Sequence, residues 1–136
     1  MLRGISSGLV LLFGLCCAVS AQDRSAQGHT KDSLDTVKQG LAEKKAILVD
    51  VRELDEWNEG HIKNAIFLPM SQLRQGVSAE KLKELLPEGK IVYLHCAAGG
   101  RCLKAADLLK DKGYDLRPLK PGYEALVKAG FEKAPK

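Results

Sequence analysis

The six residues from Cys96 to Arg101 are the best candidates in this sequence for a covalent reaction. They follow an apolar, β-branched and aromatic run at 91–94, which predicts a buried strand, and precede a helical pattern that begins at Leu103. Glycines at 99 and 100 let successive N–H groups point inward, and the start of the helix adds unpaired N–H groups and positive dipole. Such surroundings lower the pKa of a cysteine from about 8.5 into the range of roughly 3.5 to 7.5. We therefore expect Cys96 to be a thiolate nucleophile that carries an anionic group on its sulfur.

A cysteine at the end of a buried strand is also often just a small apolar core residue. Here the glycine pair, the following helix and the permanent charge of Arg101 favour a functional cysteine. We expect Arg101 to orient an oxyanion and the rest of the loop to surround the substrate. The expected substrate-binding residues are Ala97, Ala98, Gly99, Gly100 and Arg101.

Strands that alternate with helices are expected to position this loop. Apolar runs predict strands at 46–51, 65–69 and 91–94, with a weaker one at 115–119. Apolar spacing, capping serines and terminating glycines or prolines predict helices at 33–45, 53–58, 78–86, 103–112 and 123–129. This order predicts an α/β fold with a mainly parallel sheet flanked by helices. Ligands of such sheets bind beyond the carboxyl ends of the strands, where Cys96 lies.

The first 21 residues differ in composition from the rest of the chain. Arg3 precedes an almost uncharged apolar run at 8–19, and small residues end at Ala21, which predicts a secretory signal peptide at 1–21. A membrane anchor is the alternative, although the apolar run is shorter than the roughly 20 residues needed to cross a bilayer. Residues 22–32 are polar and without apolar periodicity, so we expect a flexible leader before a single domain at 33–134.

Composition predicts an ordinary globular domain and points to no particular macromolecular partner. The chain has 136 residues, of which 45% are hydrophobic and 28% charged. Cleavage would remove one basic residue and no acidic one, which changes the net charge from +4 to +3. Basic and acidic residues alternate, whereas nucleic-acid binding needs clustered basic residues. We expect a monomer, periplasmic or secreted, with no stable membrane association after cleavage.

Two segments resemble the signatures of the rhodanese superfamily. One is the active-site loop at 96–101, and Gly122 followed by Tyr123 is similar to the closing segment of that family. The other lies within 47–70 and comprises Asp50, Val51, Arg52, Glu53, Glu56, Gly60, His61, Ile62, Ala65 and Pro69. The resemblance covers about residues 33–131 and is closest to single-domain exported rhodaneses of the phage-shock-protein type.

The resemblance implies a single rhodanese-like domain with sulfurtransferase activity. In this family the thiolate of the residue that matches Cys96 takes a sulfane sulfur from a donor such as thiosulfate and holds it as a persulfide. A thiophilic acceptor, cyanide or a thiol, then removes the sulfur. The partners implied are small sulfur-containing anions and thiol acceptors, and no metal or organic cofactor is needed. Covalent catalysis divides the transfer into two simpler steps, and the loop amides stabilise the persulfide anion.

Loop length and composition refine the expected substrate. Related phosphatases and arsenate reductases have loops one residue longer, which accommodate a tetrahedral anion, so the six-residue loop favours a single sulfur atom. Many members that prefer thiosulfate carry a basic residue directly after the cysteine, where this chain has Ala97 and Ala98. Thiosulfate is then expected to be a poor donor compared with a persulfide or polysulfide. The alternatives are a non-catalytic rhodanese module for partner binding or sulfur carriage, and a phosphatase or arsenate reductase.

Several polar and aromatic residues near these motifs are expected to be structural. Asp50 and Arg52 follow the first buried strand and, as in the family, should support the neighbouring loop by ion pairing instead of acid–base chemistry. His61 has no second His or Cys at metal-ligand spacing, so we expect a turn residue and no metal site. His95 is expected to pack beneath the loop, and Trp57 in the core.

Cys102 allows two interpretations. It shares a helical apolar stripe with Ala105, Ala106 and Leu109, which predicts a buried structural residue. The alternative is a redox partner that attacks an oxidised or persulfidated Cys96 and forms a disulfide. A peptide linked through Cys96 and Cys102 in non-reduced, oxidised protein would support the second interpretation.

Overall fold

A four-stranded parallel sheet forms the centre of the computed structural model, which describes residues 28–136. Its strands lie in the order β2-β1-β3-β4. Their bounds are β1 Ala46–Asp50, β2 Ile66–Phe67, β3 Ile91–His95 and β4 Asp115–Pro118. The chain leaves β1 for β2 on one side and then crosses to β3 on the other, so its connections diverge between β1 and β3. Open α/β sheets bind their ligands at this divergence, beyond the carboxyl ends of the strands.

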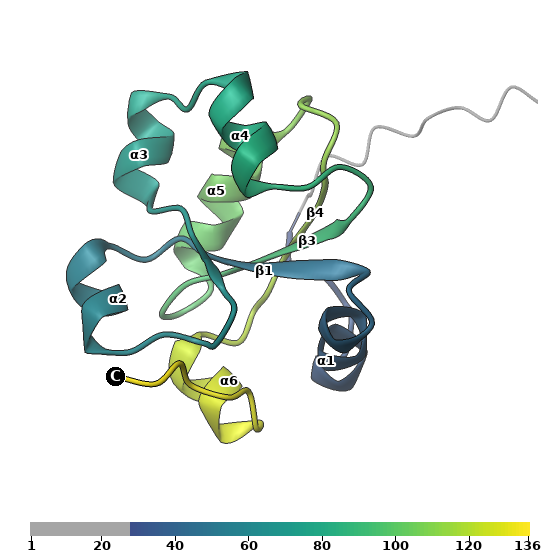
Figure 1. The fold of residues 1–136 in the computed structure, drawn as a ribbon, viewed down its shortest axis with the longest axis vertical. Helices are drawn as coiled ribbons and strands as arrows, with labels where there is room; N and C mark the ends of the chain where they lie inside the picture. The colour runs from purple at the N-terminus through teal and green to yellow at the C-terminus, as the bar shows by residue number, and fades with distance from the viewer. Residues whose placement is uncertain (1–27) are drawn as a thin grey trace, which may run out of the picture.

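Helices cover both faces of the sheet, as Figure 1 shows. Two of them pack on one face: α1 (Leu34–Ala42) and α6 (Tyr123–Lys128). Three pack on the other: α3 (Met70–Gln75), α4 (Ala79–Leu85) and α5 (Gly100–Leu109). Helix α2 (Leu54–Glu59) follows β1 directly and lies at the carboxyl end of the sheet. The predicted α/β architecture with a parallel sheet flanked by helices is confirmed.

Alternation along the central strands supplies both halves of the core. Val49 and Leu94 point to the face covered by α3, α4 and α5, whereas Leu48 and Tyr93 point to the face covered by α1 and α6. All four side chains are at most 2% exposed. Strands β1 and β3 are therefore buried on both faces. Their pairing holds their carboxyl ends in fixed register.

Most elements differ by one to three residues from their predicted bounds, and three differences affect the account of the fold. Helix α3 was not predicted, because its six residues supply only two buried positions, Met70 and Leu73, too few for a periodic pattern. Strand β2 has two residues instead of five, since only Ile66 and Phe67 pair with β1. Helix α5 begins at Gly100 instead of Leu103, because Gly100, Arg101 and Cys102 are already helical directly after the N-cap Gly99.

The described part of the expected leader lies against the domain. The N–H of Thr30 donates to the carbonyl of Pro118 at 2.8 Å, and the Asp32 carboxylate accepts from Tyr93 Oη at 2.7 Å and from Arg117 Nη1 at 2.8 Å. Residues 28–32 are therefore bound to the ends of β3 and β4. The expected signal peptide at 1–21 and residues 22–27 lie outside the described residues. Within 28–136, no helix is long and apolar enough to cross a membrane.

The backbone at the start of α6 contacts the backbone of the loop that follows β3. The N–H of Tyr123 donates to the carbonyl of Cys96 at 2.9 Å. The neighbouring Gly122 has no space for a side chain, because a Cβ there would overlap the carbonyl of Ala97. Helix α6 thus positions the loop that carries Cys96.

We expect Gly122→Ala to lower the free energy of unfolding by more than about 2 kcal/mol. The start of α6 and the Cys96 loop would have to move apart to make room for the methyl group. Gly100→Ala is the matched control, since a Cβ at Gly100 meets nothing within 4 Å and alanine favours a helix. Chemical denaturation of both variants measures the difference. Equal stability of the two variants would contradict this account of the contact.

Candidate active site

Cys96 lies directly after β3, at the divergence between β1 and β3, and is 1% exposed. The N–H of Gly99 donates to its sulfur at 3.1 Å. Gly99 has φ 86° and ψ −7°, in the left-handed region that glycine tolerates without strain, and it caps the N-terminus of α5. This turn directs the Gly99 N–H and the start of the helix at the same sulfur atom.

The surroundings of Cys96 favour the thiolate. The neighbouring Cys102 thiol has the largest effect, and N–H groups of Cys102, Ala98 and Gly99 add to it. Burial of the sulfur opposes them. Together these effects lower the pKa of Cys96 to about 5, so the sulfur is a thiolate at neutral pH.

Cys102 is fully buried on the inner face of α5, as one of the two interpretations predicted. Its sulfur lies 3.1 Å from the carbonyl oxygen of Gly99 and 3.3 Å from that of Leu119. The negative charge of Cys96 and burial raise the pKa of Cys102, so this residue stays a protonated donor. Both cysteines are free thiols in the structure. A disulfide between them stays a prediction.

Asp50 and Arg52 form a buried ion pair beside the loop. Arg52 Nη2 lies 2.8 Å from Asp50 Oδ2, and Arg52 Nε lies 3.0 and 3.1 Å from the two carboxylate oxygens. The same guanidinium donates to the carbonyl of Gly60 at 2.8 Å and lies 4.1 Å from the ring centroid of Tyr123. The pair therefore connects the end of β1 to the end of α2 and the start of α6.

His95 lies beneath the loop and is fully buried. Its Nε2 is 3.6 Å from Asp50 Oδ2, and neither ring nitrogen has a hydrogen-bond partner among residues 28–136. Burial lowers the pKa of His95, which the charge of Asp50 opposes. The imidazole is thus neutral at pH 7 and contributes no positive charge to the sulfur.

Arg101, expected to orient an oxyanion, is paired with a carboxylate of α2. Its Nη1 and Nη2 donate to Glu56 Oε1 and Oε2 at 2.6 and 2.8 Å. This two-point contact holds the pKa of the Glu56 carboxyl below its usual value. The loop residues Ala97 and Ala98 are exposed and supply no charge. The cation expected to face a substrate is therefore already neutralised by the protein.

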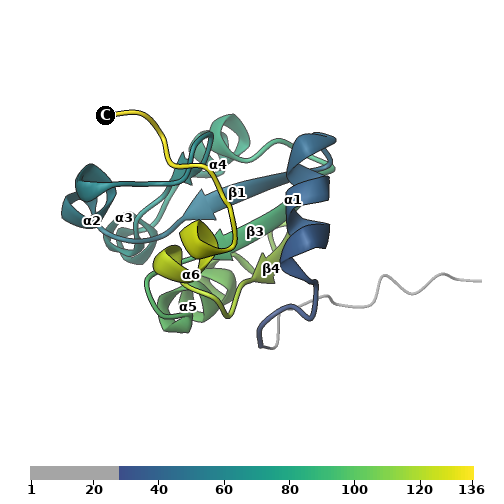
Figure 2. The same cartoon turned by 90° about the horizontal axis from the view of Figure 1, so that it is seen from below.

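A cavity of about 340 Å³ opens beside Ala97 and gives access to the loop. It is predominantly acidic at its rim, with two exposed carboxylates, Glu59 and Glu124, besides the paired Glu56. Its complete lining is Arg52, Glu56, Glu59, Gly60, Ala97, Tyr123, Glu124 and Lys133. Lys133 belongs to the C-terminal segment, which Figure 2 shows returning toward α2.

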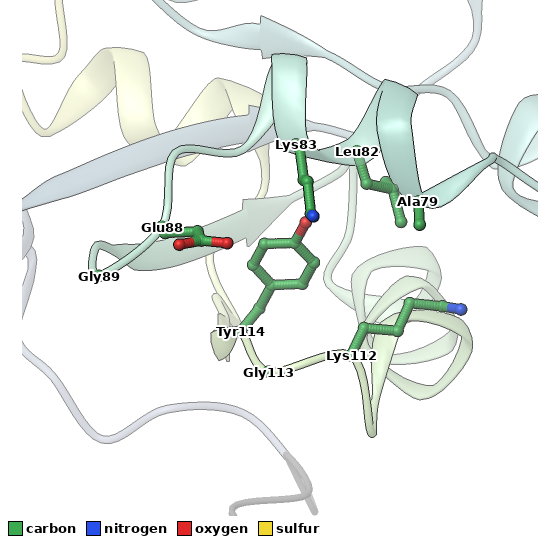
Figure 3. A pocket seen from close by; sticks show the side chains of 8 residues that line it. All are labelled: Ala79, Leu82, Lys83, Glu88, Gly89, Lys112, Gly113 and Tyr114. Carbon is green, nitrogen blue, oxygen red and sulfur yellow. The ribbon is translucent and has the colours of Figure 1, made fainter.

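A second cavity, of about 490 Å³, lies at the amino ends of the strands, away from Cys96. Figure 3 shows the Tyr114 ring projecting into it between Lys83 and Glu88, with Lys112 at its edge. It contains no cysteine or histidine, and no polar side chain in it is buried. Its lining supplies no group for covalent chemistry.

His61 and Trp57 form a stacked pair at the end of α2. Their rings are 3.6 Å apart at an interplanar angle of 4°, and His61 Nδ1 lies 3.1 Å from the carbonyl of Trp57. Trp57 is only half-buried, so its expected place in the core is wrong. The described residues contain no cluster of His, Cys, Asp and Glu suited to a metal ion.

Sequence reasoning missed two contacts of the loop. Glu56 was noted as part of a motif, but its pairing with Arg101 spans 45 positions and has no local signal. His29 Nε2 lies 2.7 Å from the carbonyl oxygen of Gly99, although its segment was expected to be a flexible leader. Polar composition cannot distinguish a disordered segment from one held by hydrogen bonds.

The chain is similar in sequence and fold to known proteins. The Rhodanese-like domain model matches residues 33–129. A solved structure of the human single-domain sulfurtransferase TSTD1 has a TM-score of 0.60 and 26% identity, over 74% of this chain and 97% of that one. A rhodanese-like domain protein from Staphylococcus aureus has a TM-score of 0.57 and 30% identity, over 73% and 92% of the two chains.

A curated relative is much longer than this chain. The tRNA uridine(34) hydroxylase of Chlamydia muridarum is 34% identical over 95 residues, which is 60% of this chain and 29% of that protein. The shared part therefore corresponds to one segment of the hydroxylase. With the family model spanning most of the described residues and the fold in agreement, the chain belongs to the rhodanese-like domain family.

Proposed function

We propose that this protein transfers a sulfane sulfur through a persulfide on Cys96. The observation that carries the proposal is the Gly99 N–H, 3.1 Å from the Cys96 sulfur at the start of α5. That arrangement stabilises a negative charge on sulfur before and after the transfer. Membership of the rhodanese-like family and the similarity to the human sulfurtransferase support the same activity.

The proposed reaction has two balanced displacements. In the first, the Cys96 thiolate attacks the outer sulfur of a donor, the donor's S–S bond breaks, and the departing group takes the electron pair. In the second, an acceptor thiolate or cyanide attacks the outer sulfur of the Cys96 persulfide, and the Cys96 thiolate is released. Each displacement exchanges one S–S bond for another or for an S–C bond, so no external oxidant is required.

The charges near the loop support a persulfide or polysulfide donor over thiosulfate. Both arginines near the sulfur are already paired, Arg52 with Asp50 and Arg101 with Glu56. The cavity beside the loop also carries two exposed carboxylates, Glu59 and Glu124, against one exposed lysine, Lys133. A dianion approaching this rim meets like charge, whereas a neutral or singly charged donor is less affected.

The alternatives have less support. The lowered pKa of Cys96 favours catalysis over a module that only binds a partner or carries sulfur. The short loop and the paired Arg101 disfavour a tetrahedral phosphate or arsenate. Periplasmic or secreted location and a monomeric state are also part of the proposal, and the location rests on the composition of residues 1–21.

The chain from residue 22 and its Cys96→Ser variant test the proposal directly. We expect transfer from an organic persulfide to cyanide or a thiol by the unmodified chain, weaker transfer from thiosulfate, and none by Cys96→Ser. Equal thiocyanate production by both proteins would disprove the Cys96 mechanism. Inactivity of the unmodified chain with every donor would favour the binding module.

Alkylation of Cys96 is expected to follow its lowered pKa. The thiolate is the reactive form, so the iodoacetamide rate constant should rise with pH around a midpoint near 5 and level off above about pH 7. Mass spectrometry of quenched reactions gives the rate at each pH. Cys96→Ser should lose this reaction, because the thiolate is removed and Cys102, on the inner face of α5, stays protonated. A midpoint near 8.5, the value for an ordinary cysteine, would contradict a stabilised thiolate.

Releasing Arg101 should improve the use of thiosulfate. Glu56→Gln removes the carboxylate that pairs with Arg101, so we expect kcat/KM for thiosulfate to rise roughly five- to tenfold, which corresponds to about 1 to 1.4 kcal/mol. Transfer from a neutral persulfide should change less than about twofold. Glu84→Gln is the control, because Glu84 pairs with Lys81 on the surface of α4 and the change in net charge is the same. Equal gains in both variants would assign the effect to net charge alone.

A further inference from the structure

We propose that residues 28–32 form part of the active site and that His29 is a positioning residue for the Cys96 loop. The inference extends the proposed sulfur transfer, whose thiolate it concerns. Its central contact joins His29 Nε2 to the carbonyl oxygen of Gly99 at 2.7 Å. A carbonyl oxygen can only accept, so the ring nitrogen is the donor.

Gly99 is the residue on which this contact acts. Its N–H donates to Cys96 at 3.1 Å, and its carbonyl accepts from both His29 and the Cys102 thiol. The N–H and the carbonyl of Gly99 lie in successive peptide planes joined by its φ and ψ, so a bond that holds the carbonyl restrains the left-handed turn and limits how far the N–H can turn away from the sulfur. A thiol is a weak donor. The single proton of the Cys102 thiol is also in reach of the Cys96 sulfur and the Leu119 carbonyl, so without His29 the Gly99 carbonyl would have only this weak, shared donor.

The segment that carries His29 is anchored to β3, the strand that leads into the loop, and to the neighbouring strand β4. Thr30 is bound to Pro118 of β4, and Asp32 is bound to Tyr93 of β3 and to Arg117 of β4. The pairing with Arg117 lowers the pKa of Asp32, so the carboxylate is charged at neutral pH. These contacts place residues 28–32 across the end of the sheet from which the Cys96 loop emerges.

His29 lies outside the residues that the Rhodanese-like domain model matches, which are 33–129. The space it occupies is tight, because a Cβ on Gly99 would lie 3.2 Å from His29 Nε2 and 2.6 Å from the carbonyl oxygen of Lys120. The segment and the loop before α6 therefore enclose Gly99 from two directions.

Two substitutions test the role of His29 in the chain from residue 22. His29→Ala removes the donor, and we expect the alkylation midpoint of Cys96 to rise by about one pH unit and kcat/KM for a persulfide donor to fall about tenfold. His29→Gln keeps an N–H donor and should restore both values to within about threefold of the unmodified chain. Lys31→Ala, an exposed position of the same segment, is the matched control and should change neither.

A double-mutant cycle with Asp32→Ala tests whether the anchor acts through His29. If Asp32 holds the segment in place, its removal should raise the alkylation midpoint in the unmodified chain and add little in His29→Ala. Thermal unfolding of every variant shows that the fold is retained.

Two outcomes would overturn the proposal. One is an unchanged alkylation midpoint in a folded His29→Ala protein, and the other is a His29→Gln protein as impaired as His29→Ala. Failure of sulfur transfer in the unmodified chain would disprove the proposed function instead, because the alkylation measurement needs no turnover.

Discussion

A buried negative charge on sulfur has to be matched by N–H groups, and this requirement governs the architecture around Cys96. An unpaired charge in an apolar interior is costly, and the described residues bring no unpaired cation into hydrogen-bond contact with the sulfur. The match comes from the Cys102 thiol together with backbone N–H groups, through the left-handed turn at Gly99 and the first turn of α5. The parallel sheet serves the same end, since it places this turn where the connections between β1 and β3 diverge.

The charged side chains around the site are organised mainly in pairs. Arg52 pairs with Asp50, Arg101 with Glu56, and Arg117 with Asp32 and Asp115. The Arg52 and Arg101 pairs connect segments at the carboxyl end of the sheet, and Arg117 connects Asp32 to β4, so these charges support the scaffold more than they reach a ligand. The positive potential at the loop therefore comes mostly from peptide dipoles, which suits a polarisable sulfur better than a multiply charged oxyanion.

The sequence was informative where local pattern and burial coincide. Apolar runs at 46–51 and 91–94 predicted the two central strands. The position of Cys96 after the second run predicted its place at the carboxyl end of the sheet. Short elements such as α3 were missed, because a single turn and a half carries too little periodicity. Trp57 was wrongly placed in the core, since ring size suggests burial but does not show that a histidine stacks on it outside the core. Contacts such as that of Glu56 with Arg101 depend on tertiary geometry, which no local pattern encodes.

The contact between α6 and the Cys96 loop limits how this protein can diversify. The Tyr123 N–H donates to the carbonyl of Cys96, and Gly122 lies directly against Ala97. The backbone at the start of α6 therefore leaves no space for the loop to expand. An inserted loop residue, which a larger tetrahedral substrate would need, could not be accepted by the loop alone. The chain would have to move the start of α6 and with it the aromatic ring that packs on Arg52. Substrate size is thus coupled to the C-terminal helix, and a change of chemistry at this site would require coordinated changes in two distant parts of the gene.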